Sequence, residues 1–205
     1  PWRLGREANI FEVHYFNYLE LYSAIKNRDE SSFIMTIEVD PAYGKYHWSG
    51  HRACNISMPP SESISLKGRC PICGRKMTKG VAERVEELAD RPPGARPEKA
   101  IPFKHVLPLS EILSAALNKP PESQEVWELY MKLVKEFGNE IRILLDIPLN
   151  LLKEKVPPLA YKLLEDMRYD RLNIKPGYDG VYGQLLVNKK EISLLGQARL
   201  EDFIA

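Results

Sequence analysis

The sequence predicts an α+β fold in which a small cysteine-containing module is followed by a mainly helical region with a short β-hairpin. Three observations support this prediction. A histidine and three cysteines fall into two close pairs between residues 51 and 73. Apolar residues recur at helical spacing between residues 109 and 169. The segment 173–187 is punctuated by glycines and ends in the strand-like sequence Gln-Leu-Leu-Val, which is typical of a hairpin.

Two elements are expected ahead of the cysteines. Residues 17–26 carry an apolar side chain every three or four positions, which predicts a helix. Residues 31–39 are apolar and rich in strand-favouring residues, so they are predicted to form a strand that leads into the module. The following loop, residues 40–50, holds two tyrosines, a tryptophan, a lysine and a histidine. Its aromatic residues could stack on nucleic-acid bases or pack the small module, and the sequence leaves both interpretations open.

The cysteines are better explained by a metal than by disulfides. An odd number of cysteines cannot form a closed set of disulfides, and no export leader is recognisable. Cys70 and Cys73 are separated by two residues and followed by a glycine, and His51 and Cys54 have the same two-residue spacing. Fifteen residues separate Cys54 from Cys70. This pattern predicts a zinc-ribbon-like module with a closed, four-ligand, structural Zn²⁺ site.

The fourth ligand has alternatives. His47 is the main competitor of His51, and a water molecule or a carboxylate could also complete the site. A module built on three unrelated buried thiols is the interpretation without a metal, and the paired spacing argues against it.

The net charge of +1 conceals a local excess of positive charge. Residues 41–80 contain seven basic side chains and one acidic side chain, a net charge of +6. Residues 1–40 carry a net charge of −3, and residues 105–205 have 13 basic and 15 acidic groups. Positive charge is therefore concentrated around the cysteines, which is typical of a surface that binds a polyanion. A solvated basic loop is the simpler alternative.

The second half of the chain is predicted to be mainly helical. Residues 91–102 are rich in proline and polar residues and predict an ordered loop or linker. Helices are expected beyond it, the clearest being bounded by two prolines before it and by Gly138, a residue typical of a left-handed cap. The expected helical segments are residues 109–117, 123–137, 140–146 and 158–169.

The glycine-rich segment near the end of the chain is a second candidate site. Three glycines in residues 177–183 allow close backbone approach to a ligand, although a hairpin turn requires them equally. The candidate ligand-contacting side chains of this loop are Tyr178, Asp179 and Tyr182.

Several segments of the sequence resemble the endonuclease Q family, and together they extend over essentially the whole chain. They are residues 37–48, 50–54, 70–74, 84–91 and 176–183. The resemblance implies an N-terminal PHP (polymerase and histidinol phosphatase) metal-dependent catalytic domain, joined to a zinc-binding domain and a helical C-terminal region. It also implies an enzyme that nicks DNA on the 5′ side of deaminated bases, such as uracil and hypoxanthine, and of abasic sites.

The resemblance implies a division of labour along a longer polypeptide. The catalytic divalent metals are expected in a domain that precedes Pro1, so this chain alone is expected not to cut DNA. The implied domains are residues 1–39, the end of the PHP domain; 40–90, the zinc-binding module; 91–187, the helical C-terminal domain; and 188–205, a tail.

The basic module is expected to grip DNA and to help wall the pocket of an extruded base. The expected phosphate contacts are Lys45, Arg52, Arg75, Lys76 and Lys79. The expected stacking or wedging residues are Tyr43, Tyr46 and Trp48.

The tail resembles the motif by which repair proteins bind the sliding clamp PCNA. Gln197, Leu200, Phe203 and Ile204 have the required spacing, in which three apolar side chains would fill a pocket. A helix that packs on its own chain is the alternative.

Two other function classes compete with this interpretation. One is a zinc-ribbon DNA-binding adaptor without nuclease activity. The other is a self-contained metalloenzyme that uses His14, His47 and His105, but no closely spaced His/Asp/Glu motif accompanies these histidines. No apolar run is long enough to span a bilayer, and an intracellular, cytoplasmic and nucleoid-associated protein is expected.

Overall fold

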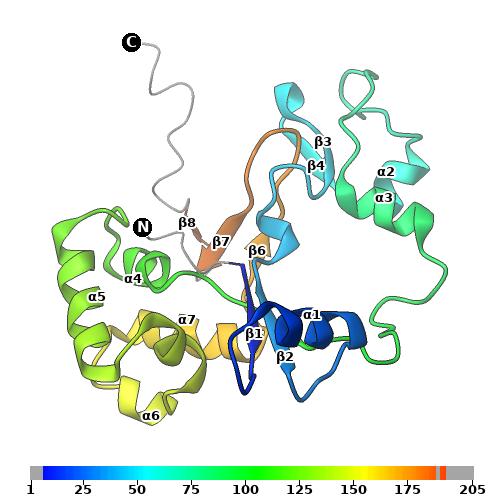
Figure 1. Cartoon of the computed structure of the whole chain (residues 1–205). Coiled ribbons are helices and arrows are strands. Elements are labelled where there is room, and N and C mark those ends of the chain that lie inside the picture. The colour runs from blue at the N-terminus through cyan, green and yellow to red at the C-terminus, as the bar shows by residue number, and fades with distance from the viewer. Residues whose placement is uncertain (1–6, 188–189, 193–205) are drawn as a thin grey trace. The chain divides into compact units, whose positions relative to one another are not determined.

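The computed structural model describes residues 7–187 and 190–192. The chain divides into two compact units (Figure 1). Unit 1 combines the segments up to Val39 and Arg96–Leu172, and unit 2 combines Asp40–Ala95 with Asn173–Ile192. The PCNA-like tail, residues 197–205, lies outside the described residues. No helix among the described residues has the length and apolar character that a membrane span requires.

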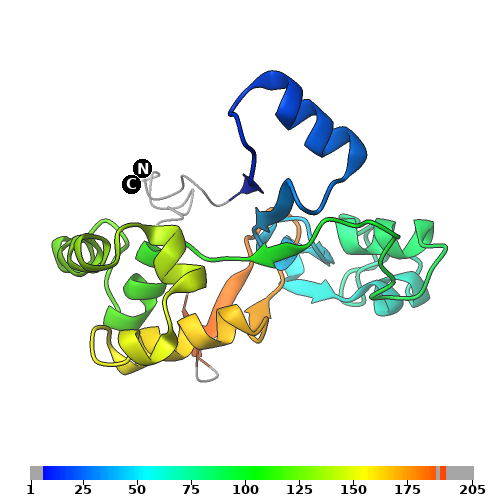
Figure 2. The ribbon, with the colours of Figure 1, turned by 60° about the horizontal axis from the view of Figure 1, so that its bottom comes forward.

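Unit 1 begins with a three-stranded sheet in the order β1-β2-β5. Strands β1 (Ala8–Phe11) and β2 (Phe33–Glu38) are antiparallel, and β5 (Phe103–His105) runs parallel to β2. Helix α1 (Tyr18–Asn27) connects β1 to β2 and stands clear of the strands in Figure 2. The predicted helix at 17–26 and strand at 31–39 are therefore confirmed.

The rest of unit 1 is helical, as predicted. It contains α4 (Leu109–Leu117), α5 (Gln124–Phe137), a π-helical turn (Arg142–Asp146), α6 (Leu149–Leu152) and α7 (Pro158–Arg168). Their apolar faces meet in a core of fully buried side chains, because each helix carries an apolar stripe. The largest of these side chains are Leu107, Leu109, Ile112, Leu113, Leu133, Ile143, Leu144, Leu152, Leu164 and Met167.

Local chemistry sets the limits of α5. The Ser123 hydroxyl accepts a hydrogen bond from the Val126 N–H (3.5 Å), and Gly138 donates its N–H to Val134 O (2.8 Å). Gly138 has φ 99° and ψ −56°, so it ends the helix with a positive φ but outside the left-handed helical region that the sequence analysis expected.

Unit 2 contains two small sheets. Strands β3 (Ser49–His51) and β4 (Ile56–Met58) form an antiparallel hairpin. Strands β6 (Ile174–Lys175), β7 (Gln184–Val187) and β8 (Lys190–Ile192) form an antiparallel sheet in that order, which confirms the predicted hairpin. Unit 2 also contains two short helices, α2 (Pro60–Ser65) and α3 (Val81–Leu88).

The compact units divide the chain differently from the predicted domains. The segment up to Val39, predicted as the end of a separate domain, groups with Arg96–Leu172. The sequence analysis assigned residues 173–187 to the helical domain, whereas the structure groups Asn173–Ile192 with Asp40–Ala95. Backbone hydrogen bonds explain the difference. The Trp48 N–H donates to Gly177 O (2.9 Å), and the Gly177 N–H donates to Ala42 O (2.9 Å). These hydrogen bonds join segments far apart in the sequence.

Candidate metal centre and nucleic-acid interface

Four side chains with metal-binding atoms lie together in unit 2. The ligand atoms of His51, Cys54, Cys70 and Cys73 are all within 4.8 Å of one another. The Sγ atom of Cys73 is 3.4 Å from Nδ1 of His51. These are the four residues that the sequence analysis named as metal ligands, and the structure brings all of them to one place.

A hairpin positions the first pair of ligands. Strands β3 and β4 pair with His51 opposite Ile56, and a 3₁₀ turn, Arg52–Cys54, connects the strands. Asn55 ends the turn with φ 53°, and its N–H donates to Arg52 O (3.0 Å). Asparagine tolerates this left-handed conformation better than most residues, so the turn can bring the Cys54 thiol back beside the imidazole.

A second tight turn positions the other pair of ligands. Arg69 and Lys76 form an antiparallel bridge at its base. The Cys70 N–H donates to Arg75 O (2.8 Å), and the Gly74 N–H donates to Cys70 O (2.8 Å). Gly74 has φ 70°, a conformation in which a side chain is unfavourable, which is why glycine follows the second cysteine of the pair.

The two turns are held side by side over a small core. Gly50 and Thr78 exchange two backbone hydrogen bonds, of 3.0 and 2.8 Å. Met58, Cys70 and Met77 are buried beneath them. Because this core contains few apolar side chains, a bound metal would supply much of the stability of the module.

The thiols of Cys54 and Cys70 differ in how readily they ionise in the absence of a cation. Burial raises the pKa of Cys54 to about 11, and the neighbouring sulfurs of Cys73 and Cys70 act in the same direction. Burial opposes ionisation of Cys70 too, but N–H groups of Cys73 and Ile72 lead the interactions that lower its pKa to about 6. A cation would favour the thiolate form of all three cysteines, and three thiolates with one imidazole are a donor set that suits tetrahedral zinc.

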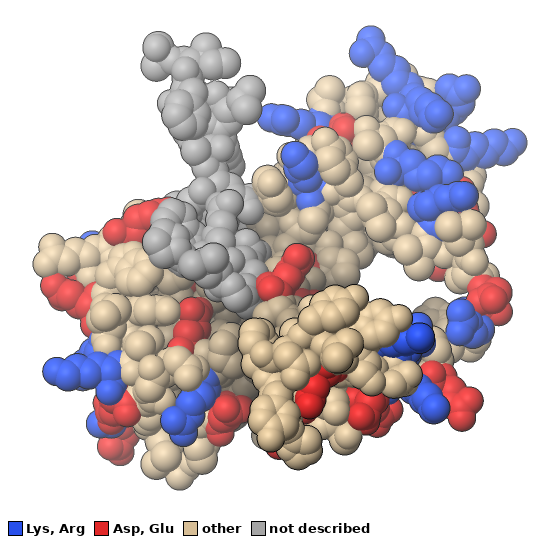
Figure 3. Space-filling model, in the orientation of Figure 1, with Lys and Arg blue, Asp and Glu red and all other residues tan. Residues whose placement is uncertain are grey.

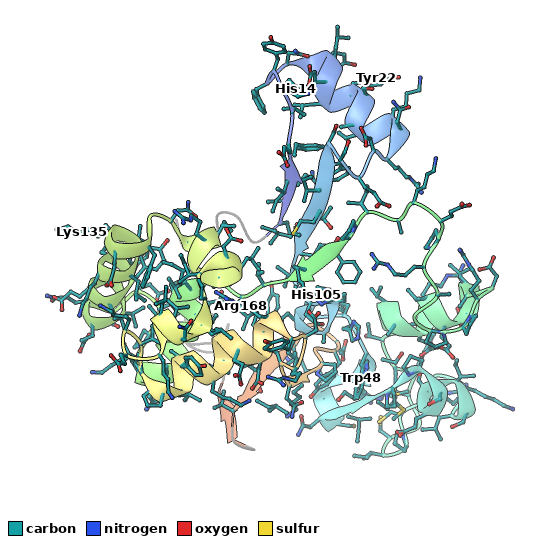
Figure 4. All side chains as sticks on the ribbon, turned by 90° about the horizontal axis from the view of Figure 1, so that it is seen from below. His14, Tyr22, Trp48, His105, Lys135 and Arg168 are labelled. Atoms are coloured by element: carbon teal, nitrogen blue, oxygen red, sulfur yellow. The ribbon has the colours of Figure 1, made fainter. Side chains whose placement is uncertain are left out.

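The other histidines lie apart from this group. His47, the competing fourth ligand, is not among the clustered ligands of the described residues. It is half-buried, and burial lowers its pKa although Asp40 acts in the opposite direction. His14 lies close to α1 and His105 lies at the end of β5, on separate parts of unit 1 (Figure 4).

The glycine-rich loop docks on the metal-binding module through two of the predicted site residues. Asp179 accepts hydrogen bonds from the Arg52 N–H (2.6 Å) and from the Thr78 hydroxyl (2.5 Å). Burial raises the pKa of Asp179, but these hydrogen bonds outweigh it, so the net pKa is lowered. Tyr178 is buried and donates its hydroxyl to Asn55 Oδ1 (2.7 Å). Both side chains are therefore engaged within the protein.

The predicted phosphate-contacting residues are all exposed. Figure 3 shows the Lys and Arg side chains gathered on one face of the part of unit 2 that contains β3, β4 and α2. Lys79 differs, because its ammonium lies 3.5 Å from a Glu83 carboxylate oxygen and forms an ion pair with Glu87, which neutralises its charge. All five predicted residues, Lys45, Arg52, Arg75, Lys76 and Lys79, are exposed, and Lys79 is the one that forms these ion pairs with Glu83 and Glu87.

The predicted stacking residues separate into packing and surface residues. Tyr43 is 4% exposed, so its ring packs within unit 2 and offers no face to a base, which agrees with the packing interpretation of this loop. Trp48 is partly buried, and its backbone pairs with that of Tyr178. Tyr46 is 44% exposed and remains a candidate for stacking.

Two further exposed basic residues lie close in the sequence to Cys70. Lys67 and Arg69 are exposed, and the Arg69 guanidinium donates to Gly74 O (3.1 Å) beside the metal ligands. The charge count of residues 41–80 included both of them, so the sequence held a signal for their location, although it did not single them out.

A family model and two proteins of known sequence match the chain. Residues 108–171 match the family described as the MJ0043 C-terminal domain. An uncharacterized protein, MJ0043, from Methanocaldococcus jannaschii is 31% identical over 94% of this chain and 24% of its own length. The uncharacterized protein YqxK of Bacillus subtilis is 29% identical over 89% of this chain and 43% of its own length.

Two solved structures match almost the entire chain. The lesion-specific endonuclease PfuEndoQ from Pyrococcus furiosus has a TM-score of 0.80 and 34% identity, over 98% of this chain and 48% of the other. Endonuclease Q in complex with a 27-mer duplex that carries an abasic lesion has a TM-score of 0.76 and 35% identity, over 98% of this chain and 49% of the other. The predicted resemblance to endonuclease Q is confirmed.

The similarity to endonuclease Q covers almost all of this chain but only part of the solved endonuclease Q chains. The chain spans about half the length of the solved endonuclease Q structures. The family model, which describes a C-terminal domain, covers α4 to α7 of this chain and is consistent with a match to a C-terminal part.

Proposed function

We propose that this chain is the zinc-containing, DNA-binding portion of a repair endonuclease that nicks 5′ to deaminated bases, such as uracil and hypoxanthine, and to abasic sites. The observation that carries the proposal is a cluster of four metal-binding side chains on turns that also carry exposed Arg side chains, in a chain similar over 98% of its length to endonuclease Q. Catalytic divalent metals would be held by another domain of the longer polypeptide, and this chain alone would not cut DNA.

The metal centre would act through structure. When bound, Zn²⁺ would accept the Cys54, Cys70 and Cys73 thiolates and the His51 imidazole, filling its tetrahedron and leaving no position for a reactive water. The two turns that hold these ligands also carry the exposed Arg52 and Arg75 side chains. Fixing the turns therefore fixes the positions of the cations that meet the phosphates.

The salt dependence of DNA binding tests the proposed phosphate contacts. Replacing both Arg75 and Lys76 by Ala should weaken binding to every duplex by a similar factor. It should also reduce the slope of log K against log salt by roughly 0.9 for each phosphate that is no longer neutralised. The matched control replaces Lys132 and Lys135, two exposed lysines of α5. An unchanged slope in the Arg75/Lys76 variant, or an equal change in the control, would refute this interface.

A cleavage assay separates the nuclease proposal from the zinc-ribbon adaptor. The chain and its longer parent are incubated with uracil-containing DNA and a divalent metal. Cutting by the parent alone supports the proposal, and cutting by neither protein supports the adaptor. Cutting by the chain itself contradicts the location of the catalytic metals outside it.

The sliding clamp PCNA remains a proposed partner on sequence grounds, through Gln197, Leu200, Phe203 and Ile204. Deleting residues 197–205 should abolish binding to the clamp. Clamp affinity that survives the deletion would remove this proposal without affecting the others.

A further inference from the structure

Three exposed side chains of unit 2 form one surface although they come from two distant segments. Tyr46 is 44% exposed and Tyr182 is 45% exposed. The Lys45 ammonium lies 5.5 Å from the centre of the Tyr46 ring and 5.8 Å from the centre of the Tyr182 ring. One cation therefore contacts both aromatic rings, at distances typical of cation–π interactions.

The backbone fixes the positions of these side chains. Three N–H groups of the glycine-rich loop donate to the loop that carries Lys45 and Tyr46. The bonds run from Gly177 to Ala42 O (2.9 Å), from Gly180 to Lys45 O (2.9 Å) and from Gly183 to Tyr43 O (3.1 Å). Because the two loops are tied together on both sides of Tyr182, the surface is ordered before a ligand arrives.

The glycines of this loop permit that close contact. A Cβ atom at Gly183 would lie 2.1 Å from Ala42 O, and one at Gly177 would lie 2.5 Å from Gly44 O. These two glycines therefore meet the protein's own backbone, which leaves the exposed Tyr182 side chain as a part of the loop that a ligand can reach.

The chemistry of the surface suits an unpaired nucleobase. Aromatic side chains stack on the faces of bases, and an adjacent cation favours the phosphate that accompanies each base. A base within a duplex has its faces covered by its neighbours, whereas an extruded or single-stranded base exposes them. Asp179, the carboxylate of the same loop, already accepts hydrogen bonds from Thr78 and Arg52.

We propose that Lys45, Tyr46 and Tyr182 form a stacking platform for an unpaired nucleobase. This inference rests on the proposed function, since it names the part of the DNA that this surface would receive. In this platform Tyr182 binds the ligand together with Tyr46, and Lys45 contacts both rings.

Photo-crosslinking tests the platform directly. The full chain is irradiated with single-stranded DNA that carries one 5-iodouracil, a base that crosslinks to aromatic side chains stacked on it. Mass spectrometry should place the crosslink on Tyr182 or Tyr46. A crosslink confined to other residues would overturn the platform.

Affinity measurements with matched variants complete the test. Tyr182→Leu should bind single-stranded DNA about tenfold more weakly, equivalent to about 1.4 kcal/mol, whereas Tyr182→Phe should bind like the wild type. Affinity for an intact duplex should change less than about twofold, because the phosphate contacts remain. Equal single-strand affinities for Tyr182→Leu and the wild type would also overturn the platform.

The two proposals fail in different ways. A wild-type chain that binds neither single-stranded nor duplex DNA contradicts the proposed function. A wild-type chain that binds DNA, but whose crosslinks and affinity do not depend on Tyr182 or Tyr46, contradicts the platform alone.

Discussion

Single residues in unit 2 connect the metal centre to the rest of the unit. Asp179 accepts one hydrogen bond from the turn that carries Cys54 and another from Thr78, the partner of Gly50 between the two metal-binding turns. Its carboxylate therefore connects the first turn to the segment that follows the second turn, without being a metal ligand. Asp179 was predicted as a site residue that contacts a ligand. Its hydrogen bonds to Arg52 and Thr78 were not predicted, because the proximity of distant segments leaves no periodic pattern in the sequence.

The choice between His51 and His47 can be tested by substitution. His51→Ala should lower zinc affinity at least about tenfold, since the loss of even an outer-sphere partner of a metal ligand costs about 10–100-fold. Thermal stability should fall with it. His47→Ala is the matched control, because His47 lies outside the ligand group, and it should retain its zinc. Zinc content and melting temperature measure both effects, and a loss of zinc only in the His47 variant would reverse the assignment.

Asp179 should contribute measurably to stability. Asp179→Asn replaces one of two accepting oxygens by an amide donor, so the Arg52 N–H or the Thr78 hydroxyl loses its partner, at a cost of about 1–3 kcal/mol. Asp170→Asn is the control, because the Asp170–Lys104 pair is exposed and such pairs contribute about 0–1 kcal/mol. Urea unfolding of both variants compares the free energies, and equal losses would contradict the bridging role.

At the scale of secondary structure, local signals were sufficient for the long helices. Helices α4 and α5 were predicted because their apolar residues repeat at helical spacing and because two prolines precede α5 and Gly138 follows it. The metal ligands were predictable for the same reason, since each pair lies within four consecutive residues.

Helix α3 was not predicted although its apolar residues have helical spacing, and its buried face could not be read from the sequence. Its apolar residues, Val81, Val85 and Leu88, share a face by their spacing, yet all are exposed. The buried side chain is Glu83, which accepts a hydrogen bond from the Ser49 hydroxyl and lies 3.5 Å from Lys79. A buried carboxylate with a hydroxyl donor from a distant segment and a lysine one turn away is stable, but no periodic pattern in the sequence indicates its burial.

Helices α1 and α4 of unit 1 carry leucine side chains of opposite exposure, and substituting these leucines tests where the core of unit 1 lies. Leu113 of α4 is fully buried, whereas Leu19 of α1 is 73% exposed. Leu113→Ala should cost about 2–5 kcal/mol, because apolar burial is reduced and a cavity forms. Leu19→Ala should change stability by less than about 0.5 kcal/mol, because the side chain buries little area in this chain. Calorimetry on both variants checks the contrast, and a large loss at Leu19 would show that its face is covered.

At the scale of the whole chain, the two units depend on different sources of stability. The core of unit 1 contains many fully buried aliphatic side chains from α4 to α7. The metal-binding turns of unit 2 cover a small core of Met58, Cys70 and Met77. Structural zinc contributes about 10–16 kcal/mol in small zinc modules, comparable to the total stability of a domain, about 5–15 kcal/mol. Unit 2 should therefore depend on its metal and unit 1 should not.

Removal of the metal should consequently affect one unit selectively. With a strong zinc chelator, amide hydrogen exchange should accelerate in residues 40–95 and 173–187, while the amides of α4, α5 and α7 keep their protection. The loops that carry Tyr46 and Tyr182 belong to unit 2, so single-stranded DNA binding should fall with the same chelator dependence. Added Zn²⁺ should restore both properties, and Mg²⁺ should restore neither, because thiolates select zinc over hard cations.

The dependence of unit 2 on its metal also determines how its stability should change with pH. The pKa of Cys54 is raised to about 11 in the absence of a cation, so zinc binding must displace a proton from this thiol. Zinc affinity should therefore rise with pH. Acid should release the metal, so amide hydrogen exchange should accelerate in unit 2 at a higher pH than in unit 1. Exchange that accelerates equally in both units on chelation, or in neither, would contradict a structural role of the metal confined to unit 2.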